Sequence, residues 1–301
     1  MSTTSITRCG AIAIIGKPNT GKSTLMNAIL GAKLSIVSPK PQTTRKNVLG
    51  IYTEEDVQIL FLDTPGVLTP RYELHKSMME YVKNSIAESD AVMVLIDAVN
   101  ARKSSEFLTP EFTTMLQSSG LPVFCVFNKV DALKNRRDVL PLIIQYQQLG
   151  LFKEFFTISA LENKYVEDML KTIAGYMPEG VFLHDAEDLS TLPQRFFISE
   201  IIREVIFHEF EQEIPYSAEV LIQEFKEREI GKWYIAADII VERDTQKAIL
   251  IGKKGEKIKA VGQKARIAAE EHLGTAVFLE IFVKVRNDWR NSKTQLSGFG
   301  Y

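Results

Sequence analysis

Short apolar runs alternate with longer segments of helical periodicity through the first half of the chain. Apolar runs of this length without a polar face are typical of strands buried on both sides of a parallel sheet. The runs lie at Ala11–Ile15, Val57–Leu62, Ala91–Asp97, Pro122–Asn128 and Phe155–Ile158, and the helical segments at Lys22–Leu30, Glu73–Glu88, Phe107–Ser119 and Arg136–Gln148. The alternation predicts a doubly wound α/β domain with a mostly parallel sheet, to which Arg45–Tyr52 adds an antiparallel edge strand.

The pattern changes near Met177, where a polar and acidic stretch with Pro and Gly extends to Pro193 and predicts a linker. The segments after it are a helix at Arg195–Phe210, strands at Ser217–Glu227 and Lys232–Glu242, helices at Gln246–Ile251 and Glu256–Leu273, and a strand at Ala276–Arg286. We therefore predict a first domain over residues 1–178, a linker over 179–193 and a smaller α+β domain over 194–301.

Charge is distributed unevenly along the chain. The net charge of −2 gives no signal for nucleic acid, but residues 241–293 carry 12 Lys and Arg against 7 Asp and Glu. The remainder carries 24 against 31. A basic C-terminal region joined to an acidic remainder suggests a module that binds a polyanion.

Cysteine content and hydropathy indicate where in the cell the protein is expected. The two cysteines, Cys9 and Cys125, cannot form a disulfide framework and have no zinc-type spacing. No apolar run reaches the ~18 residues of a spanning helix, and the segment Met1–Cys9 lacks the pattern of a signal peptide. These features exclude an integral membrane protein and predict a cytoplasmic location.

A phosphate-binding loop follows the first predicted strand. Residues 16–23, GKPNTGKS, match the pattern GxxxxGK[ST] and open a predicted helix, which is the context this motif requires. Gly16 and Gly21 let the backbone approach a polyphosphate, whose charge the N–H groups at the helix start stabilise. Lys22 is expected to reach the outer phosphates, and the Ser23 hydroxyl to take a magnesium position.

Three further motifs identify the nucleotide, each at the end of a predicted strand, where α/β proteins bind ligands. In the first, residues 63–66 (DTPG), Asp63 is expected to hold Mg²⁺ through a water and the Gly66 N–H to contact the γ-phosphate. In the second, residues 128–131 (NKVD), the Asp131 carboxylate can accept the two donors of the guanine edge, which adenine lacks. In the third, the N–H groups of Ser159 and Ala160 are expected to meet guanine O6.

Together these motifs predict a site for GTP. The predicted nucleotide-binding residues are Gly16, Lys17, Pro18, Asn19, Thr20, Gly21, Lys22, Ser23, Thr24, Asp63, Thr64, Pro65, Gly66, Val67, Asn128, Lys129, Val130, Asp131, Ser159 and Ala160.

A second glycine motif lies in the basic region. Ile251 and Ile258 flank the GxxG at 252–255, between a short predicted helix and a longer one. This context resembles a KH domain, whose loop clamps about four nucleotides of single-stranded nucleic acid. The predicted RNA-binding residues are Ile251, Gly252, Lys253, Lys254, Gly255, Lys257 and Ile258, with Lys259 and Lys264 near the groove. For Trp289 we favour a role in covering the last strand over stacking on bases.

Over nearly its full length the chain resembles the Era family of bacterial ribosome-assembly GTPases. The resemblance rests on the ordered nucleotide motifs, on Gln42-Thr43-Thr44-Arg45 as a switch I motif, and on the GxxG module. It implies a P-loop GTPase domain followed by a type II KH domain. By position Thr44, rather than Thr43, is the expected magnesium ligand in the triphosphate state. The predicted metal ligands are thus Ser23, Thr44 and Asp63, and the predicted catalytic residues are Lys22, Thr44 and Gly66.

Two residues depart from the Ras pattern. Val67 stands where Ras-like proteins carry the glutamine that orients the attacking water, so we expect slow intrinsic hydrolysis. Asn19 lies inside the phosphate loop, where in similar GTPases an asparagine helps to coordinate K⁺; the alternative is a turn residue with unusual dihedral angles. The cluster of Lys40, Arg45 and Lys46 is interpreted either as a solvated face or as an RNA-facing switch, and His75 as a solvated surface residue rather than a base.

The leading hypothesis is a GTPase switch that controls the KH module on RNA. The resemblance implies the 3′ end of 16S ribosomal RNA and the small ribosomal subunit as partners, Mg²⁺ as cofactor, and peripheral association with the inner face of the cell membrane. A monomer is the default expectation. The alternative hypothesis is a constitutive RNA-binding chaperone whose nucleotide domain is largely structural.

Overall fold

The chain folds into two units. The computed structural model describes residues 7–301. The first unit takes in the described residues up to Ser35 together with Thr44–Pro70 and His75–Thr191. The second takes in Ile36–Thr43, Arg71–Leu74 and Leu192–Tyr301.

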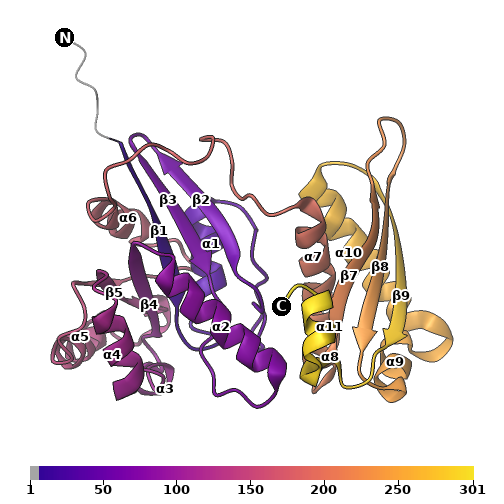
Figure 1. Cartoon of the computed structure of the whole chain (residues 1–301), viewed down its shortest axis with the longest axis horizontal. Coiled ribbons are helices and arrows are strands. Elements are labelled where there is room, and N and C mark those ends of the chain that lie inside the picture. Colours follow the sequence, from indigo (N-terminus) through magenta and orange to yellow (C-terminus); the bar gives the residue numbers. More distant parts are fainter. Residues whose placement is uncertain (1–6) are drawn as a thin grey trace, which may run out of the picture. The chain divides into compact units, whose positions relative to one another are not determined.

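The first unit is built on a six-stranded sheet of order β2-β3-β1-β4-β5-β6 (Figure 1). Its strands are β1 (Arg8–Ile15), β2 (Val48–Glu54), β3 (Val57–Asp63), β4 (Ala91–Asp97), β5 (Val123–Asn128) and β6 (Glu154–Thr157). All neighbouring strands are parallel except β2, which pairs antiparallel with β3. Every residue of β4 is buried. The predicted fold class, including the antiparallel edge strand, is confirmed.

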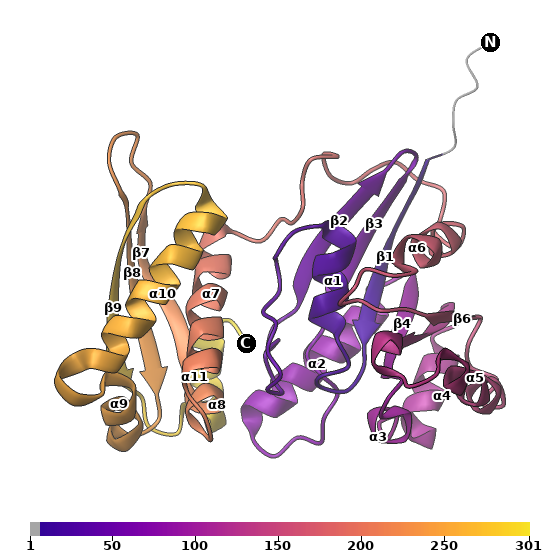
Figure 2. The same ribbon diagram turned by 180° about the vertical axis from the view of Figure 1, so that it is seen from behind.

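Helices cover both faces of this sheet, which is why its central strands are apolar throughout. The helices are α1 (Lys22–Leu30), α2 (Glu73–Ala87), α3 (Ala101–Ser104), α4 (Pro110–Ser118), α5 (Val139–Gln147) and α6 (Val166–Ala174). One core lies between the sheet and α1 and α6, the pair in front of the sheet in Figure 2. The other core joins the opposite face to the remaining four helices.

Two predicted helices begin later than expected, and four helices were not predicted: α3, α6, and the two short helices Ile214–Ser217 and Lys293–Gly298. The segment predicted as a helix from Phe107 begins only at Pro110, because the Thr109 hydroxyl caps the helix and proline suits its first turn. The segment predicted from Arg136 starts with a 3₁₀ turn, Arg136–Asp138, before α5. The longest of these four, α6, buries Val166, Met169, Leu170 and Ile173 along one face.

Part of the predicted linker is bound to the first unit. The buried side chain of Gln58 donates to the carbonyl of His184 (2.9 Å) and accepts the N–H of Leu183 (2.8 Å). Farther along, the carbonyl of Leu189 accepts the N–H of Ile51 on β2 (2.9 Å). These bonds hold residues 183–189 along the edge of the sheet.

The second unit has a three-stranded sheet of order β7-β8-β9 with helices on one face. Its elements are α7 (Gln194–Glu209), α8 (Ile214–Ser217), β7 (Glu219–Lys226), β8 (Trp233–Val241), α9 (Asp244–Ile251), α10 (Glu256–Leu273), β9 (Val277–Val285) and α11 (Lys293–Gly298). Strand β8 pairs antiparallel with β7 and parallel with β9. Helices α7, α9 and α10 pack their apolar faces against the sheet, as predicted for the α+β domain.

Within residues 7–301, none of the helices combines the length and the apolar character needed to cross a bilayer. The first six residues, on which part of the signal-peptide expectation rests, lie outside the described residues.

Candidate functional site

The phosphate-binding loop joins β1 to α1, as the sequence predicts. Gly21 takes a left-handed conformation (φ 97°) directly before the helix, which a side chain would disfavour. The ammonium of Lys22 donates to the carbonyls of Gly16 (3.2 Å) and Lys17 (3.1 Å). The Thr20 hydroxyl donates to the same Lys17 carbonyl (3.0 Å). The loop is therefore closed on itself around the lysine.

Lys22 is buried, and burial lowers its pKa to about 8, although the nearby charge of Asp63 acts in the opposite direction. A desolvated ammonium interacts more strongly with an anion than one in water. The loop thus presents a cation that a polyphosphate would stabilise.

Three predicted metal ligands meet beside the loop. The Ser23 hydroxyl donates to Asp63 Oδ2 (2.8 Å) and lies 3.0 Å from the Thr44 hydroxyl. Asp63 is fully buried, and its Oδ1 has no hydrogen-bond partner among the described residues. Burial raises the pKa of Asp63, while Lys22 and the hydroxyls act to lower it.

Carboxylate and hydroxyl oxygens are hard ligands, which suit Mg²⁺ better than softer metals. The unpaired buried oxygen of Asp63 is the kind of acceptor that a cation or its water would satisfy. The donor set therefore fits the expected ion, and the choice of Thr44 over Thr43 agrees with the position of the Thr44 hydroxyl.

The loop after β3 lies against the phosphate-binding loop. The N–H of Val67 donates to the carbonyl of Gly16 (2.9 Å), and a Cβ on Gly66 would lie 2.7 Å from the backbone nitrogen of Pro18. Thr64 is buried and donates to the carbonyl of Ile14 (2.7 Å). The Val67 side chain points into the core of the first unit, so this position supplies no group to orient water.

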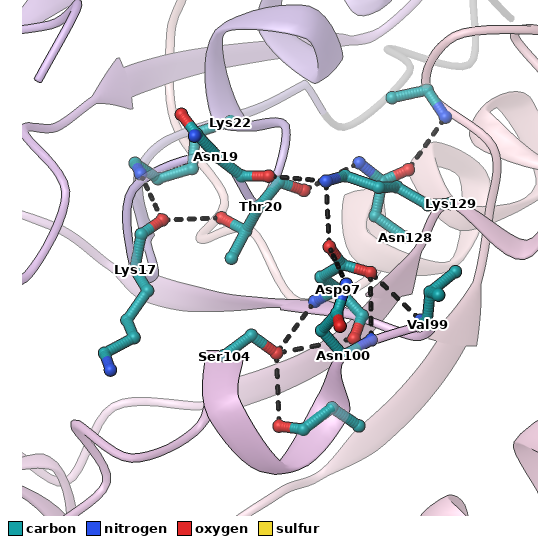
Figure 3. A network of polar contacts seen from close by, with 12 residues as sticks. Lys17, Asn19, Thr20, Lys22, Asp97, Val99, Asn100, Ser104, Asn128 and Lys129 are labelled. Carbon is teal, nitrogen blue, oxygen red and sulfur yellow. Dashed lines mark hydrogen bonds and ion pairs between the residues drawn. The ribbon is translucent and has the colours of Figure 1, made fainter. Parts of the chain in front are cut away.

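The guanine motif is bonded directly to the phosphate-binding loop (Figure 3). Asn128 donates from Nδ2 to the carbonyl of Thr20 (2.9 Å) and accepts the N–H of Ala160 at Oδ1 (2.9 Å). The Lys129 ammonium donates to the carbonyl of Asn19 (2.6 Å). One asparagine thus joins three of the four motifs.

The residues predicted to contact the guanine base have different environments. Asp131 is exposed, in the 3₁₀ turn Val130–Ala132. The N–H groups of Ser159 and Ala160 donate within the protein, to the carbonyl of Lys164 (3.2 Å) and to Asn128. Their role toward guanine O6 stays a prediction. Asn19 has a φ of 65°, which supports its interpretation as a turn residue.

The remaining members of the predicted nucleotide set also surround this site. Thr24 lies in the first turn of α1, Pro65 is buried after Thr64, and the side chain of Val130 packs in the core beneath the guanine motif.

The GxxG loop lies between α9 and α10, as the sequence predicts. Gly252 has φ 72° and ψ −179°, a conformation that is essentially restricted to glycine. Gly255 is left-handed, with φ 79°. The lysines between them, Lys253 and Lys254, are exposed, so the loop presents two unburied ammonium groups at the start of a helix.

The neighbouring predicted RNA-binding residues have more varied environments. Lys257 is exposed and its ammonium lies 5.8 Å from the centre of the Phe210 ring. Ile258 packs against the core of the second unit, and Ile251 ends α9 half-buried. Lys264 is paired with Glu209 (2.6 Å), which reduces the charge it offers to the groove.

The C-terminal aromatic residues form part of the core. Trp289 is fully buried and donates from its indole nitrogen to the carbonyl of Ser217 (3.0 Å). The ring of Phe299, also buried, packs edge-on against it at 5.5 Å. Trp289 is thus a buried core residue, as favoured, and its covering of the last strand stays a prediction.

Three residues of the switch segments were interpreted wrongly. Arg45 and His75 are buried, so neither is a solvated surface residue. Lys40 donates to the carbonyls of Phe207 and Phe210, at the C-terminal end of α7, instead of facing solvent or RNA. A cation suits that end of a helix, where carbonyls have no helical partner.

Comparison with known proteins agrees with this assignment. A family profile described as 50S ribosome-binding GTPase matches residues 11–129, and one described as KH domain matches residues 213–290. GTPase Era of Lactobacillus delbrueckii subsp. bulgaricus is 41% identical over 301 residues, which is 100% of this chain and 98% of that protein. GTPase Era of Geotalea uraniireducens is 42% identical over 294 residues, covering 98% of each.

Solved structures give the same result. A crystal structure of Era in complex with MgGDPNP and nucleotides 1506–1542 of 16S ribosomal RNA has a TM-score of 0.91 and 39% identity, covering 98% of this chain and 99% of that chain. A variant of Aquifex aeolicus Era bound to GDP and AlF4⁻ gives the same values. With its nucleotide loops and its GxxG module matched over essentially the whole length, this chain belongs to the Era family of GTPases.

Proposed function

We propose that this chain binds and hydrolyses GTP, and that its nucleotide state controls how the second unit binds the 3′ end of 16S ribosomal RNA during assembly of the small ribosomal subunit. The observation that carries the proposal is Asn128, whose amide joins the guanine motif to the phosphate-binding loop and to Ala160. A guanine nucleotide would meet these loops as one surface.

Selection for guanine is assigned to Asp131. Its carboxylate accepts the N1–H and amino donors of guanine, and against adenine it would lose both partners. The Asp131→Asn variant tests this: its preference should move from GTP to xanthosine triphosphate. Retained selectivity for GTP would contradict the assignment.

The phosphates are held by the loop N–H groups and by Lys22, with Mg²⁺ held by Ser23, Thr44 and Asp63. When bound, the ion neutralises charge on the outer phosphates. Lys22 places a desolvated positive charge beside the same oxygens, and the Gly66 N–H is a donor to the γ-phosphate. No side chain at position 67 orients water, so intrinsic hydrolysis is slow.

RNA is bound at the loop between α9 and α10. The glycine backbone lets a sugar–phosphate chain approach, while the exposed Lys253 and Lys254 neutralise phosphates. The Era structure that contains RNA nucleotides 1506–1542 supports 16S ribosomal RNA as the partner.

Coupling between the sites is assigned to the switch I residues in the second unit. The N–H of Val37 donates to the Glu204 carboxylate (3.2 Å), and Arg203 donates to the carbonyl of Thr43. Thr44, the next residue, is a proposed magnesium ligand. If GTP orders Thr44, it also restrains the preceding residues 37–43, which are hydrogen-bonded to α7.

The alternative is a constitutive RNA-binding chaperone, which the buried Val67 favours. Single-turnover hydrolysis measured with and without the 16S 3′ end separates the two. The switch predicts stimulation by RNA, whereas an unchanged rate supports the chaperone.

Three further properties are proposed from the family resemblance. Binding of K⁺ near Asn19 predicts faster hydrolysis in KCl than in NaCl. Peripheral membrane association predicts sedimentation with inner-membrane vesicles, and a monomeric state predicts a mass near 34.0 kDa in solution.

A further inference from the structure

Asp97 belongs to none of the nucleotide motifs, yet its carboxylate lies at the centre of the contacts in Figure 3. It is the last residue of β4 and is buried. Its Oδ2 accepts a hydrogen bond from the Lys129 ammonium (2.8 Å). Its Oδ1 accepts the N–H groups of Val99 (2.9 Å) and Asn100 (3.3 Å).

The partner of this carboxylate is the lysine that connects two nucleotide loops. Lys129 also donates to the carbonyl of Asn19 in the phosphate-binding loop (2.6 Å). Its own backbone is left-handed, with φ 67°, a conformation that costs a non-glycine residue free energy and persists only where the surroundings fix it. Asp97 and Asn19 together hold the ammonium at two points.

The electrostatics agree with a formed ion pair. Burial by itself would raise the pKa of Asp97, but the hydrogen bond and the charge of Lys129 outweigh it, so the pKa lies below its ordinary value. The Lys129 and Asp97 side chains are 36% and 11% exposed, so solvent screens this pair less than a fully exposed one.

We propose that Asp97 is a positioning residue for the guanine nucleotide: its carboxylate fixes Lys129, and so fixes the guanine motif against the phosphate-binding loop before the nucleotide arrives. The inference rests on the proposed function. A lysine ordered in advance loses less side-chain entropy on binding. Because Asp97 acts through Lys129, it affects GTP and GDP alike.

Asp97 also organises its own turn, and this role must be separated from the first. Its backbone N–H donates to the Ser104 hydroxyl (3.1 Å). Asp97→Asn keeps the side-chain oxygen that accepts from Val99 and removes the charge that holds Lys129. Ser104→Ala weakens the turn and keeps the ion pair.

The test is a double-mutant cycle on the affinity for a fluorescent GDP analogue, with full-length Asp97→Asn, Lys129→Met and the double variant. We expect Asp97→Asn to weaken binding about tenfold, the scale of one hydrogen bond to a charged group. In the Lys129→Met background, Asp97→Asn should weaken GDP binding by less than a further twofold. Ser104→Ala should lower the Tm without changing the affinity.

Equal losses from Asp97→Asn in both backgrounds, or unchanged affinity in Asp97→Asn, would overturn the inference. If Asp97→Asn is unstable, the Asp97 pKa measured by NMR in Lys129→Met decides instead: it must rise if the pair exists, and an unmoved value refutes the pair. Wild-type protein that binds no GDP would instead contradict the proposed function.

Discussion

The two glycine loops of the chain, at residues 16–23 and 252–255, use the same residue types in opposite ways. Each has two glycines and lysine at the start of a helix. In the nucleotide loop Lys22 is buried and bonded to two carbonyls, whereas Lys253 and Lys254 in the GxxG loop are exposed. The difference agrees with the proposed ligands, since a compact polyphosphate can be enclosed and a polymer must pass along an open surface.

The glycines differ in the same sense. A Cβ on Gly21 would lie 2.3 Å from Asn128 Nδ2, in a different loop, whereas one on Gly252 would lie 2.7 Å from Lys257, at the start of the helix that follows. The nucleotide loop is thus fixed by distant parts of the fold, and the GxxG loop by its neighbours in sequence. Disturbing the first should therefore have the larger effect.

The largest effect is expected for Gly21→Ala. The new methyl would collide with Asn128, and the alanine would have to keep a φ of 97°. Both effects should separate the guanine motif from the phosphate-binding loop. We expect about 100-fold weaker GDP binding by fluorescence titration, equivalent to two or more lost hydrogen bonds. Gly31→Ala, at the other end of α1 with φ 61° and no neighbouring atom within 4 Å of the new Cβ, is the control: it should cost about 1 kcal/mol of stability and no affinity. Similar affinities in both variants would contradict the proposed rigidity of the site.

A smaller loss is expected in the GxxG loop. Gly252→Ala should weaken binding of single-stranded 16S 3′ end about tenfold, because its dihedral angles suit only glycine. Gly255→Ala should lose about twofold, since its left-handed conformation is open to other residues. Electrophoretic mobility shifts measure both, and equal losses would show that the loop geometry is not what holds the RNA.

Removing the loop charges should change salt dependence more than affinity. Lys253→Ala combined with Lys254→Ala should weaken RNA binding about fivefold and make the slope of log K against log salt less negative by about 1.4, at roughly 0.7 per phosphate. Lys264→Ala serves as the control, because its pairing with Glu209 predicts little change. An unchanged slope in the double variant would place the phosphates elsewhere.

The smallest effect expected is the uptake of a proton by Lys22 when a nucleotide binds. Burial lowers the pKa of Lys22 from 10.5 to about 8. Between pH 8 and pH 10.5 the unfolded chain therefore binds more protons at Lys22 than the folded chain does. The free energy of unfolding rises with pH through this window, because burying the charged lysine costs less as it loses its proton. A bound polyphosphate restores the charge. Calorimetry of GDP binding at pH 8, in two buffers of different ionisation enthalpy, should detect uptake of about half a proton; no uptake would show that Lys22 does not meet the phosphates.

The order of elements and the local motifs were predictable because they depend on periodicity and on residues close in sequence. Helix α6 was also predictable in principle, since Val166, Met169, Leu170 and Ile173 follow helical spacing. The pairing of Asp97 with Lys129 and the burial of Arg45 depend instead on contacts between distant segments. An acidic residue at the end of the buried strand Ala91–Asp97 was the local sign of Asp97.

The central claim is that the nucleotide controls RNA binding. The direct measurement is the affinity of the full chain for a single-stranded 16S 3′ end with a non-hydrolysable GTP analogue and with GDP, in the same salt. We predict at least fivefold tighter binding with the GTP analogue, the lower end of typical coupling between sites. Equal affinities in the two states would contradict the account.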